Sequence, residues 1–315
     1  MLGLVLLPMG MVALMRVFAW DRLEPFAVAD TYSLYVYVPA WGIAGIAFVG
    51  RRLVLAVSAL VLVAAQLLFV MPEVLASAPV PSWADRTAHF RIFDANIWNE
   101  NPDVSGYAAD VKALRAQIVT LEEITPPQLS AFHREGAFDG YRFAIALPRY
   151  GSRGFLVEST FPLHAIHEVS VLGQPLMVQA EVQAPSGNFE LWVVHTQPPY
   201  PVWFQVWRRG LALVASDIRH RGPQRLLVVG DFNADWGSQG FHAVLDAGMT
   251  DAAAARGNPL EMTWSQTMPI LPPLIRIDHV LSGPEIAVTA VRTLAGPGSD
   301  HRALLATFAV ERRAR

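Results

Sequence analysis

Three long apolar blocks at the start of the chain restrict its possible folds more than any other feature. Residues 1–20 contain a single charged side chain, Arg16, and residues 31–50 and 53–71 contain none. Each block has about 20 residues, the length that an α-helix needs to cross the hydrocarbon core of a bilayer. The mean hydropathy of the whole chain is +0.32, which is high for a soluble protein. The blocks therefore predict a membrane anchor of three transmembrane helices over residues 1–71.

The first block could instead be a signal peptide that is removed from the mature protein. A signal peptide begins with basic residues, which this block lacks before Arg16. The small-residue triplets at 27–29 and 76–78 resemble cleavage sites, but such triplets are common in an alanine-rich chain. We favour three retained helices, and the sequence leaves open whether the first is cleaved.

The short loops between the blocks predict the orientation of the anchor. The loop between the second and third blocks carries Arg51 and Arg52, whereas residues 21–30 carry mostly acidic charges. By the positive-inside rule the Arg51–Arg52 loop is cytoplasmic. Three crossings then place the rest of the chain on the extracytoplasmic side of the inner (plasma) membrane. Arg16 is expected to extend to the outer interface, and Trp20 beside it is typical of an interfacial aromatic belt.

The remainder of the chain predicts a linker and one α/β domain. Residues 72–88 are rich in Pro, Ala and Ser and read as a linker, and residues 89–312 alternate short apolar runs with a few amphipathic segments. Helices are predicted at 103–116 and 201–220. Strands are predicted at 89–97, 117–124, 141–147, 154–159, 163–170, 175–183, 188–195, 224–231, 276–282 and 302–310. Many strands with few helices favour two packed sheets with helices outside.

Charge and cysteine content exclude some classes of function. Residues 85–315 carry 20 of the 24 Lys and Arg residues and 23 of the 27 Asp and Glu residues, a net charge of −3. A domain that grips the phosphates of a long nucleic acid usually has a basic surplus, so nucleic acid is a possible but not a favoured partner. The chain has no cysteine, which excludes disulfides and thiolate chemistry.

Polar side chains recur where the predicted strands end or begin. They are Asn96, Glu122, Glu123, His195, Asp231, Asn233, Asp278, His279, Asp300 and His301. Each one alone has an ordinary structural role: Asn and Asp form turns and caps, Glu faces solvent, and a lone His is most often a hydrogen-bonded core residue. The repetition at one kind of position favours a shared site instead.

The residue types in this set predict metal-assisted chemistry on phosphate. Oxygen ligands without cysteine suit a hard cation such as Mg²⁺ or Mn²⁺. Histidines among carboxylates suit the activation of water and the stabilisation of a phosphoryl group. A glycine-rich phosphate loop is absent from the sequence, so nucleotide-driven transfer is not expected. The set predicts hydrolysis of a phosphate ester.

The order of the motifs resembles the endonuclease/exonuclease/phosphatase superfamily, which has the DNase I-like fold. The motifs are DANIWN (94–99), IVTLEEI (118–124), GFLVESTFP (154–162), VVHT (193–196), GDFN (230–233), TW (263–264), IDHV (277–280) and GSDHR (298–302). The sequence departs from the family pattern at Gln117, Glu122, Thr160 and Ala303, where the family usually has Asp, Gln, a base and Pro. The resemblance implies a four-layer α/β/β/α sandwich over residues 89–312.

The resemblance also implies roles for the residues that match the family motifs. Asp231 would activate or position the attacking water, and Asn233 would steady the transition state. His301, oriented by Asp278, and His195 would contact the phosphate oxygens.

The same resemblance implies a metal ion, Mg²⁺ or Mn²⁺, on Glu123. Asn96 and Asp300 would lie close to that ion. His279 is left with a structural role, because the family varies at this position.

Three functions remain open at this stage. The favoured one is a membrane-anchored phosphoesterase whose substrate is a small or lipid-linked phosphate ester. Its architecture resembles that of the bacterial vancomycin- and teicoplanin-resistance membrane hydrolases. The alternatives are a membrane-tethered endonuclease or exonuclease and a catalytically inactive scaffold module.

An aromatic group follows the His195 strand and has two interpretations. Tyr200, Trp203, Phe204 and Trp207 could form the apolar face of a core helix, which we favour. They could instead point toward the bilayer and receive an acyl or prenyl chain.

Overall fold

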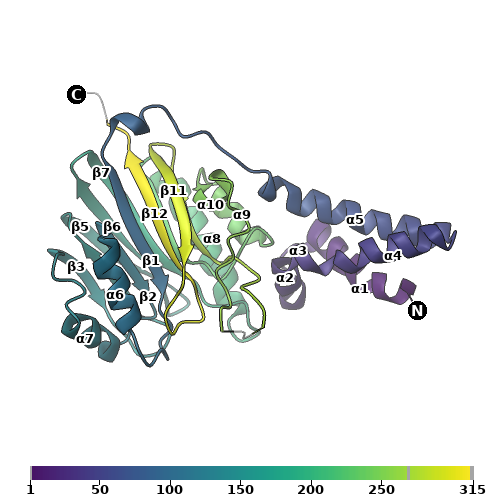
Figure 1. The fold of residues 1–315 in the computed structure, drawn as a ribbon, viewed down its shortest axis with the longest axis horizontal. Helices are drawn as coiled ribbons and strands as arrows, with labels where there is room; N and C mark the ends of the chain where they lie inside the picture. Colours follow the sequence, from purple (N-terminus) through teal and green to yellow (C-terminus); the bar gives the residue numbers. More distant parts are fainter. Residues whose placement is uncertain (1, 268–269, 313–315) are drawn as a thin grey trace.

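The computed structural model describes residues 2–267 and 270–312, which form a helical bundle beside a pair of stacked β-sheets (Figure 1). The bundle consists of the purple and blue helices of residues 2–74. An extended segment leaves its last helix and leads to the first strand of the sheets. This segment contains one short 3₁₀ helix, η1 (Ala84–Arg86). We call residues 2–74 the N-terminal bundle and residues 89–312 the two-sheet domain.

The bundle contains two helices that are long and apolar enough to cross a membrane, α1 and α5. Its described elements are α1 (Leu2–Ala19), α2 (Glu24–Thr31), α3 (Ser33–Val36), α4 (Val38–Val49) and α5 (Leu53–Val74). The prediction of three transmembrane helices is not confirmed for the second block, because this region is divided into short helices, and α2 and the α3–α4 segment are bent by 79° at their break. Pro39 lies in the first turn of α4, where its missing N–H costs nothing. The bundle therefore has two candidate spans, or three if the bent pair counts as one.

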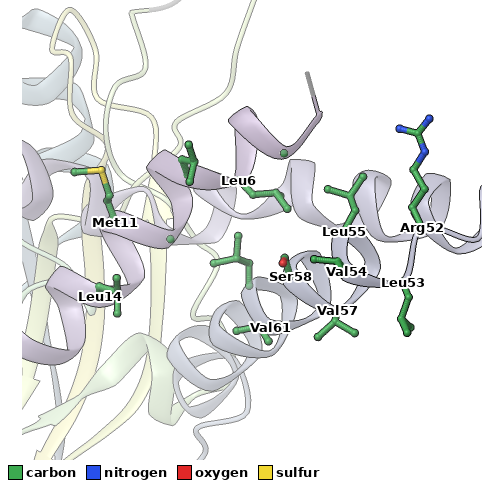
Figure 2. A pocket seen from close by; sticks show the side chains of 14 residues that line it. Leu6, Met11, Leu14, Arg52, Leu53, Val54, Leu55, Val57, Ser58 and Val61 are labelled. Carbon is green, nitrogen blue, oxygen red and sulfur yellow. The ribbon is translucent and has the colours of Figure 1, made fainter.

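The outward faces of the bundle are apolar. Phe48, Val49 and Val54 are 81%, 83% and 82% exposed. Between α1 and α5 lies an open apolar groove of about 880 Å³, and Figure 2 shows Leu6 and Leu14 among the side chains along it. An apolar surface of this extent is unfavourable in water and suits a lipid environment.

The first sheet is built around a central parallel pair. Its strands are β1 (His89–Asn96), β2 (Ile118–Glu122), β3 (Phe143–Leu147), β4 (Phe155–Ser159), β11 (Ile286–Leu294) and β12 (Ala303–Val310), in the order β11-β12-β1-β2-β4-β3. Strands β1 and β2 run parallel and are joined by helix α6 (Ser105–Leu114). The other neighbours are antiparallel.

The second sheet repeats this plan. Its strands are β5 (Leu163–Val171), β6 (Gln174–Ala184), β7 (Gly187–His195), β8 (Leu226–Asp231), β9 (Thr250–Asp251) and β10 (Asp278–Ser282), in the order β5-β6-β7-β8-β10-β9. Strands β7 and β8 run parallel and are joined by helix α8 (Phe204–Arg221). Each sheet therefore brings the carboxyl ends of two neighbouring strands to one edge.

Three apolar layers hold the domain together. Phe90 of β1 and Val193 of β7 belong to a cluster between the two sheets. Helices α6 and α7 (Pro126–Arg134) cover the outer face of the first sheet, and α8 and α9 (Gln239–Leu245) cover that of the second. A short helix, α10 (Ala252–Ala255), follows β9. The predicted α/β/β/α sandwich is confirmed.

Arg16 joins the bundle to the two-sheet domain, and the prediction that it extends to a membrane interface is wrong. Its side chain is buried, and Nη2 donates to the carbonyl of Trp236 at 3.3 Å. Nη1 lies 3.8 Å from Asp30 Oδ1. The guanidinium also lies over the Trp20 ring, 4.8 Å from its centroid. The hydropathy pattern of α1 could not indicate a partner 220 residues away.

The corner between α1 and α2 caps a helix of the two-sheet domain. Asp21 Oδ2 accepts hydrogen bonds from Ser238 Oγ at 2.9 Å and from the Gly240 amide at 3.3 Å, at the start of α9. A Cβ on Gly237 would lie 2.1 Å from the carbonyl oxygen of Asp30, so only glycine fits this approach. The two parts are therefore closely packed at residues 236–240.

Candidate active site

Strand register brings the predicted site residues together. In the parallel pairs, Asn96 lies opposite Glu122 and His195 lies opposite Asp231. Asp278 is the register partner of Asp231 on the other side of β8. The carboxyl ends of both parallel pairs thus meet at one edge of the sandwich.

Asp231 is the point at which most of the site converges. Its Oδ2 accepts hydrogen bonds from Asn96 Nδ2 at 3.0 Å and Asn233 Nδ2 at 3.2 Å. The same oxygen lies 3.7 Å from Nε2 of both His195 and His301. Burial raises the pKa of Asp231 to about 6, and Asp278 adds to the effect while the two histidines oppose it.

A strained turn aims the end of β8 into the site. Gly230 has a φ of +122°, and a Cβ there would lie 2.1 Å from the carbonyl oxygen of Val194. Asn233 has a φ of +45°, a conformation that Asn tolerates better than most residues. Asn233 Nδ2 also donates to the carbonyl of Thr196 at 2.9 Å, and Trp207 Nε1 donates to the carbonyl of Asn233 at 3.0 Å. The G-D-x-N motif is thus a fixed turn that presents an acid and an amide.

Glu123 lies just beyond the end of β2. Its φ of +61° turns it out of the strand, which leaves Glu122 facing the interior of the protein. Glu123 Oε1 accepts from Asn96 Nδ2 at 3.2 Å, and Oε2 accepts from the Asn99 amide at 3.0 Å and from the Asn99 side chain. Burial opposes the charged form, but His195 and the hydrogen bonds from Asn99 outweigh it and lower the pKa of Glu123.

Asp278 and His301 form a buried pair. Nδ1 of His301 lies 3.1 and 3.0 Å from the two oxygens of Asp278. Burial disfavours the charged ring, but Asp278 and Asp231 outweigh it and raise the pKa of His301 to about 10. The amide of Asp278 donates to Thr263 Oγ1 at 3.3 Å, so the TW motif supports this pair.

Asp300 and His195 complete the set. Asp300 Oδ1 lies 3.8 Å from His301 Nε2, and Oδ2 accepts from Trp264 Nε1 at 3.0 Å. His195 Nε2 lies 3.6 Å from Glu123 Oε1. The structure therefore gathers all eight predicted site residues: Asn96, Glu123, His195, Asp231, Asn233, Asp278, Asp300 and His301.

His279 points away from this site. It is buried in the core, with Nδ1 at 3.1 Å from Asp251 Oδ2 and Nε2 at 3.0 Å from the carbonyl oxygen of Ala234. This placement agrees with the structural role expected for it.

Sequence reasoning missed four residues that support the site. Asn99 holds Glu123, Thr196 anchors Asn233, and Trp264 holds Asp300. The hydroxyl of Ser299 donates to the carbonyl of Asn96 at 2.8 Å. Each of the four stands inside or next to a motif, so a signal was present, but sequence alone does not show which polar neighbour points at which ligand.

The aromatic side chains that follow β7 differ in burial. Phe204 and Trp207 are buried in the cluster between α8 and the second sheet, so the core interpretation is correct for these two. Tyr200 is 55% exposed and lies on the side of the domain that faces the bundle.

Solved structures share this fold. A D. rerio TDP2 humanized by 14 mutations has a TM-score of 0.58 at 16% identity, over 70% of this chain and 98% of that chain. The 3′ phosphatase NExo from Neisseria, bound to a product DNA hairpin, has a TM-score of 0.56 at 18% identity, over 69% and 98%. An endonuclease/exonuclease/phosphatase from Bacteroides vulgatus has a TM-score of 0.57 at 17% identity, over 71% and 100%.

Sequence comparison identifies the family. A search of curated protein sequences gave no match. The model of the Endonuclease/Exonuclease/phosphatase family matches residues 95–301, more than half of the chain, and this range contains every predicted site residue. The chain therefore belongs to the endonuclease/exonuclease/phosphatase family, whose members are hydrolases of phosphate ester bonds.

Proposed function

We propose that this protein is a membrane-anchored, divalent-metal-dependent phosphoesterase that hydrolyses a small or lipid-linked phosphate ester by attack of an activated water. The observation that carries the proposal is the convergence of two amides and two histidines on one oxygen of Asp231. A carboxylate held by several donors is a fixed acceptor that can orient a water molecule. The charged groups around it can stabilise the negative charge that builds on a phosphoryl group.

Glu123 is the residue best suited to hold the metal ion. Glu123 and Asp300 have side chains that are 12% and 26% exposed, so a cation can reach them. Oxygen donors of this kind, with Asn96 beside them, fit Mg²⁺ or Mn²⁺. The bound ion would supply a Lewis acid for a phosphate oxygen.

A second group of residues could hold an ion but fits less well. Ligand atoms of Asp231, Asp278 and His301 lie within 4.8 Å of one another. Both oxygens of Asp278 already face His301 Nδ1, and the raised pKa of His301 keeps its ring protonated at neutral pH, without a lone pair for a metal. We therefore assign this group to the substrate rather than to the metal.

The protein side chains then divide the reaction among them. Asp231 accepts a proton from water or orients it. The side-chain amide of Asn233 donates to Asp231 Oδ2 and to the Thr196 carbonyl, and so holds that carboxylate in place. The His301 imidazolium, held by Asp278, donates from Nε2 to a phosphate oxygen and favours the transition state over the bound ester. His195 provides a further donor beside Asp231 and Glu123.

The shape of the bundle supports an extracytoplasmic site in the inner membrane. The Arg51–Arg52 turn lies between α4 and α5, at the end of the bundle far from the sheets (Figure 1). If basic loops stay in the cytoplasm, the two-sheet domain lies on the other side. A C-terminal alkaline phosphatase fusion should then be active and a C-terminal green fluorescent protein fusion dark. The opposite pair of results would overturn this orientation.

DNA is the second candidate substrate. The 3′ phosphatase neighbour is bound to a DNA hairpin in its structure, and one TDP2 neighbour is complexed with a single-stranded DNA product. The net charge of −3 over residues 85–315 disfavours this option.

The test is turnover by the purified full-length protein in detergent. We expect hydrolysis of bis(p-nitrophenyl) phosphate with Mg²⁺ or Mn²⁺, loss of activity in excess EDTA, and recovery when the metal is restored. A panel of lipid phosphates, nucleotides and DNA would then rank the substrates. Undiminished turnover in EDTA, or no turnover of any ester, contradicts the proposal.

A further inference from the structure

A narrow cleft lies between the bundle and the two-sheet domain, beside the candidate active site. One wall comes from the end of α2, with Val28 and Tyr32. The other wall comes from the two-sheet domain, with Tyr200, Asn233 and Trp264. The bundle therefore forms part of a concave surface that neither part makes alone.

The cleft adjoins the polar site directly. Asn233 lines the cleft and also donates from Nδ2 to Asp231 at 3.2 Å. Trp264 lines it and donates from Nε1 to Asp300 at 3.0 Å. A phosphate that accepts from His301, beside Asp231 and Asp300, would therefore place one of its ester groups at the mouth of the cleft.

The chemistry of the walls selects an apolar group. The described residues along the cleft are aliphatic, aromatic, proline, threonine and one asparagine, and none of them is charged. A polar alcohol would leave its hydrogen-bonding groups unpaired against such walls, whereas a hydrocarbon chain would gain from leaving water.

In the two-sheet domain, exposed apolar side chains lie close in sequence to residues that line the cleft. Val202 follows Tyr200 in the same turn and is 76% exposed. Leu271 is also exposed and lies in the loop whose Leu274 carbonyl accepts a hydrogen bond from the Tyr35 hydroxyl. Apolar side chains beside membrane-length helices suit the boundary between headgroups and acyl chains. The cleft thus opens where lipid chains would be available.

We propose that the bundle completes the substrate site, and that the substrate is an amphiphilic phosphate ester whose hydrocarbon chain lies in the cleft between Tyr32 and Tyr200. The phosphate would sit at Asp231 and His301, so this inference rests on the proposed phosphoesterase function. The N-terminal helices then determine specificity as well as location.

A chain-length series tests the inference. The probes are methyl, octyl and hexadecyl p-nitrophenyl phosphate, which share one reactive group, in mixed detergent micelles with full-length protein and Mn²⁺. We expect kcat/KM to rise with chain length, by about fourfold for each methylene that the cleft buries. Tyr32→Ala should lower the hexadecyl-to-methyl ratio at least tenfold, and Tyr32→Phe, which keeps the ring, should preserve it.

Tyr35→Ala is the matched control. Tyr35 lies three residues further along the bundle and contacts the same loop, but it is not part of the cleft wall. This variant should keep the wild-type ratio, which separates loss of the cleft from general loosening of the bundle.

The possible results distinguish this inference from the proposed function. If none of the three esters is hydrolysed, the phosphoesterase proposal fails. If all three are hydrolysed at equal rates, or if Tyr32→Ala keeps the preference for long chains, the cleft does not take a hydrocarbon chain. Preference for a nucleotide ester that depends on Tyr32 would also overturn the inference, because the aromatic walls would then hold a base.

Discussion

The N-terminal bundle and the candidate active site both bury charged side chains, but the partners of those charges differ. Arg16 and Asp21 contact backbone groups and a helix start at residues 236–240, where each charge meets complementary donors or acceptors. In the active site, Asp231 and Asp278 are neighbouring carboxylates, and Asp278 contributes to the raised pKa of Asp231. A charge with complementary partners joins two parts of a fold, whereas like charges gathered at one point oppose stability and are typical of functional sites.

This comparison predicts two kinds of mutational effect. Substitutions in the active site should reduce kcat and leave the melting temperature almost unchanged. Substitutions of the joining charges should lower stability and leave the hydrolysis of a soluble ester almost unchanged.

His301→Ala should have the largest effect. We expect kcat on bis(p-nitrophenyl) phosphate to fall about 10³-fold, roughly 4 kcal/mol of transition-state stabilisation, with a smaller change in KM. Asp278→Asn should give a smaller loss of the same kind, because the ring keeps its place but loses its orienting charge.

The double variant tests whether Asp278 and His301 act as a pair. It should be little worse than His301→Ala alone, because residues that act as one unit are not additive. If the two losses multiply, the pairing is wrong. If the melting temperature falls instead of kcat, the pair is structural.

Asp251→Asn, in the core of the two-sheet domain, should lower stability and leave kcat almost unchanged. Asp251 Oδ2 lies 2.7 Å from Arg276 Nη2 and 3.1 Å from His279 Nδ1, in the core. Removing the charge leaves Arg276 unpaired, which should cost about 3 kcal/mol and lower Tm by roughly 6–12 °C at pH 7. Turnover below Tm should stay near the wild-type value, and a selective loss of kcat would contradict this.

The pH dependence of this effect follows from the same contacts. Burial opposes the charged form, but Arg276 and His279 outweigh it and hold the pKa of Asp251 well below its ordinary value. A lowered pKa stabilises the fold above the pKa of the unfolded chain, about 3.9, and the stabilisation is lost as the pH falls through the folded value. The difference in Tm between wild type and Asp251→Asn should therefore shrink below about pH 4.

Glu123→Gln should act through the metal requirement. Replacing a charged oxygen ligand by a neutral one should raise the Mn²⁺ concentration for half-maximal activity roughly 30-fold, about 2 kcal/mol. Glu122→Gln is the matched control. Glu122 is the same residue type at the neighbouring position, but it is fully buried in the interior of the protein. An equal shift in both variants would show that Glu123 is not a ligand.

The sequence predicted the two-sheet domain better than the bundle. Most strands were predicted, because alternating apolar runs indicate them, but β9 and β11 were not. The predicted site residues lie together because the predicted strands end at one edge and the G-D-x-N turn needs its own residue types, while their roles in catalysis stay predictions. The second apolar block was misjudged because hydropathy does not report a bend, and this one lies between Thr31 and Ser33, at the start of the block. The buried position of Arg16 and the cleft at Tyr32 depend on contacts across some 170 to 240 positions of chain, for which local pattern has no signal.

Asp21→Asn should have the smallest effect and tests the joining role most directly. Asp21 is an acceptor at the start of α9, where the free amides and the helix dipole favour a negative charge. The amide of Asn can still accept one hydrogen bond, so the loss should be about 1 kcal/mol.

Ser238→Ala removes the other partner, and the double variant should cost less than the sum of the two, because both remove the same contact. Arg22→Gln is the matched control, since Arg22 is the exposed neighbour of Asp21. We expect the Tm of the full-length protein in detergent to fall for Asp21→Asn but not for Arg22→Gln, while turnover of bis(p-nitrophenyl) phosphate is unchanged in both. If the two single effects simply add, Asp21 and Ser238 do not cooperate, and the corner between α1 and α2 does not join the bundle to α9.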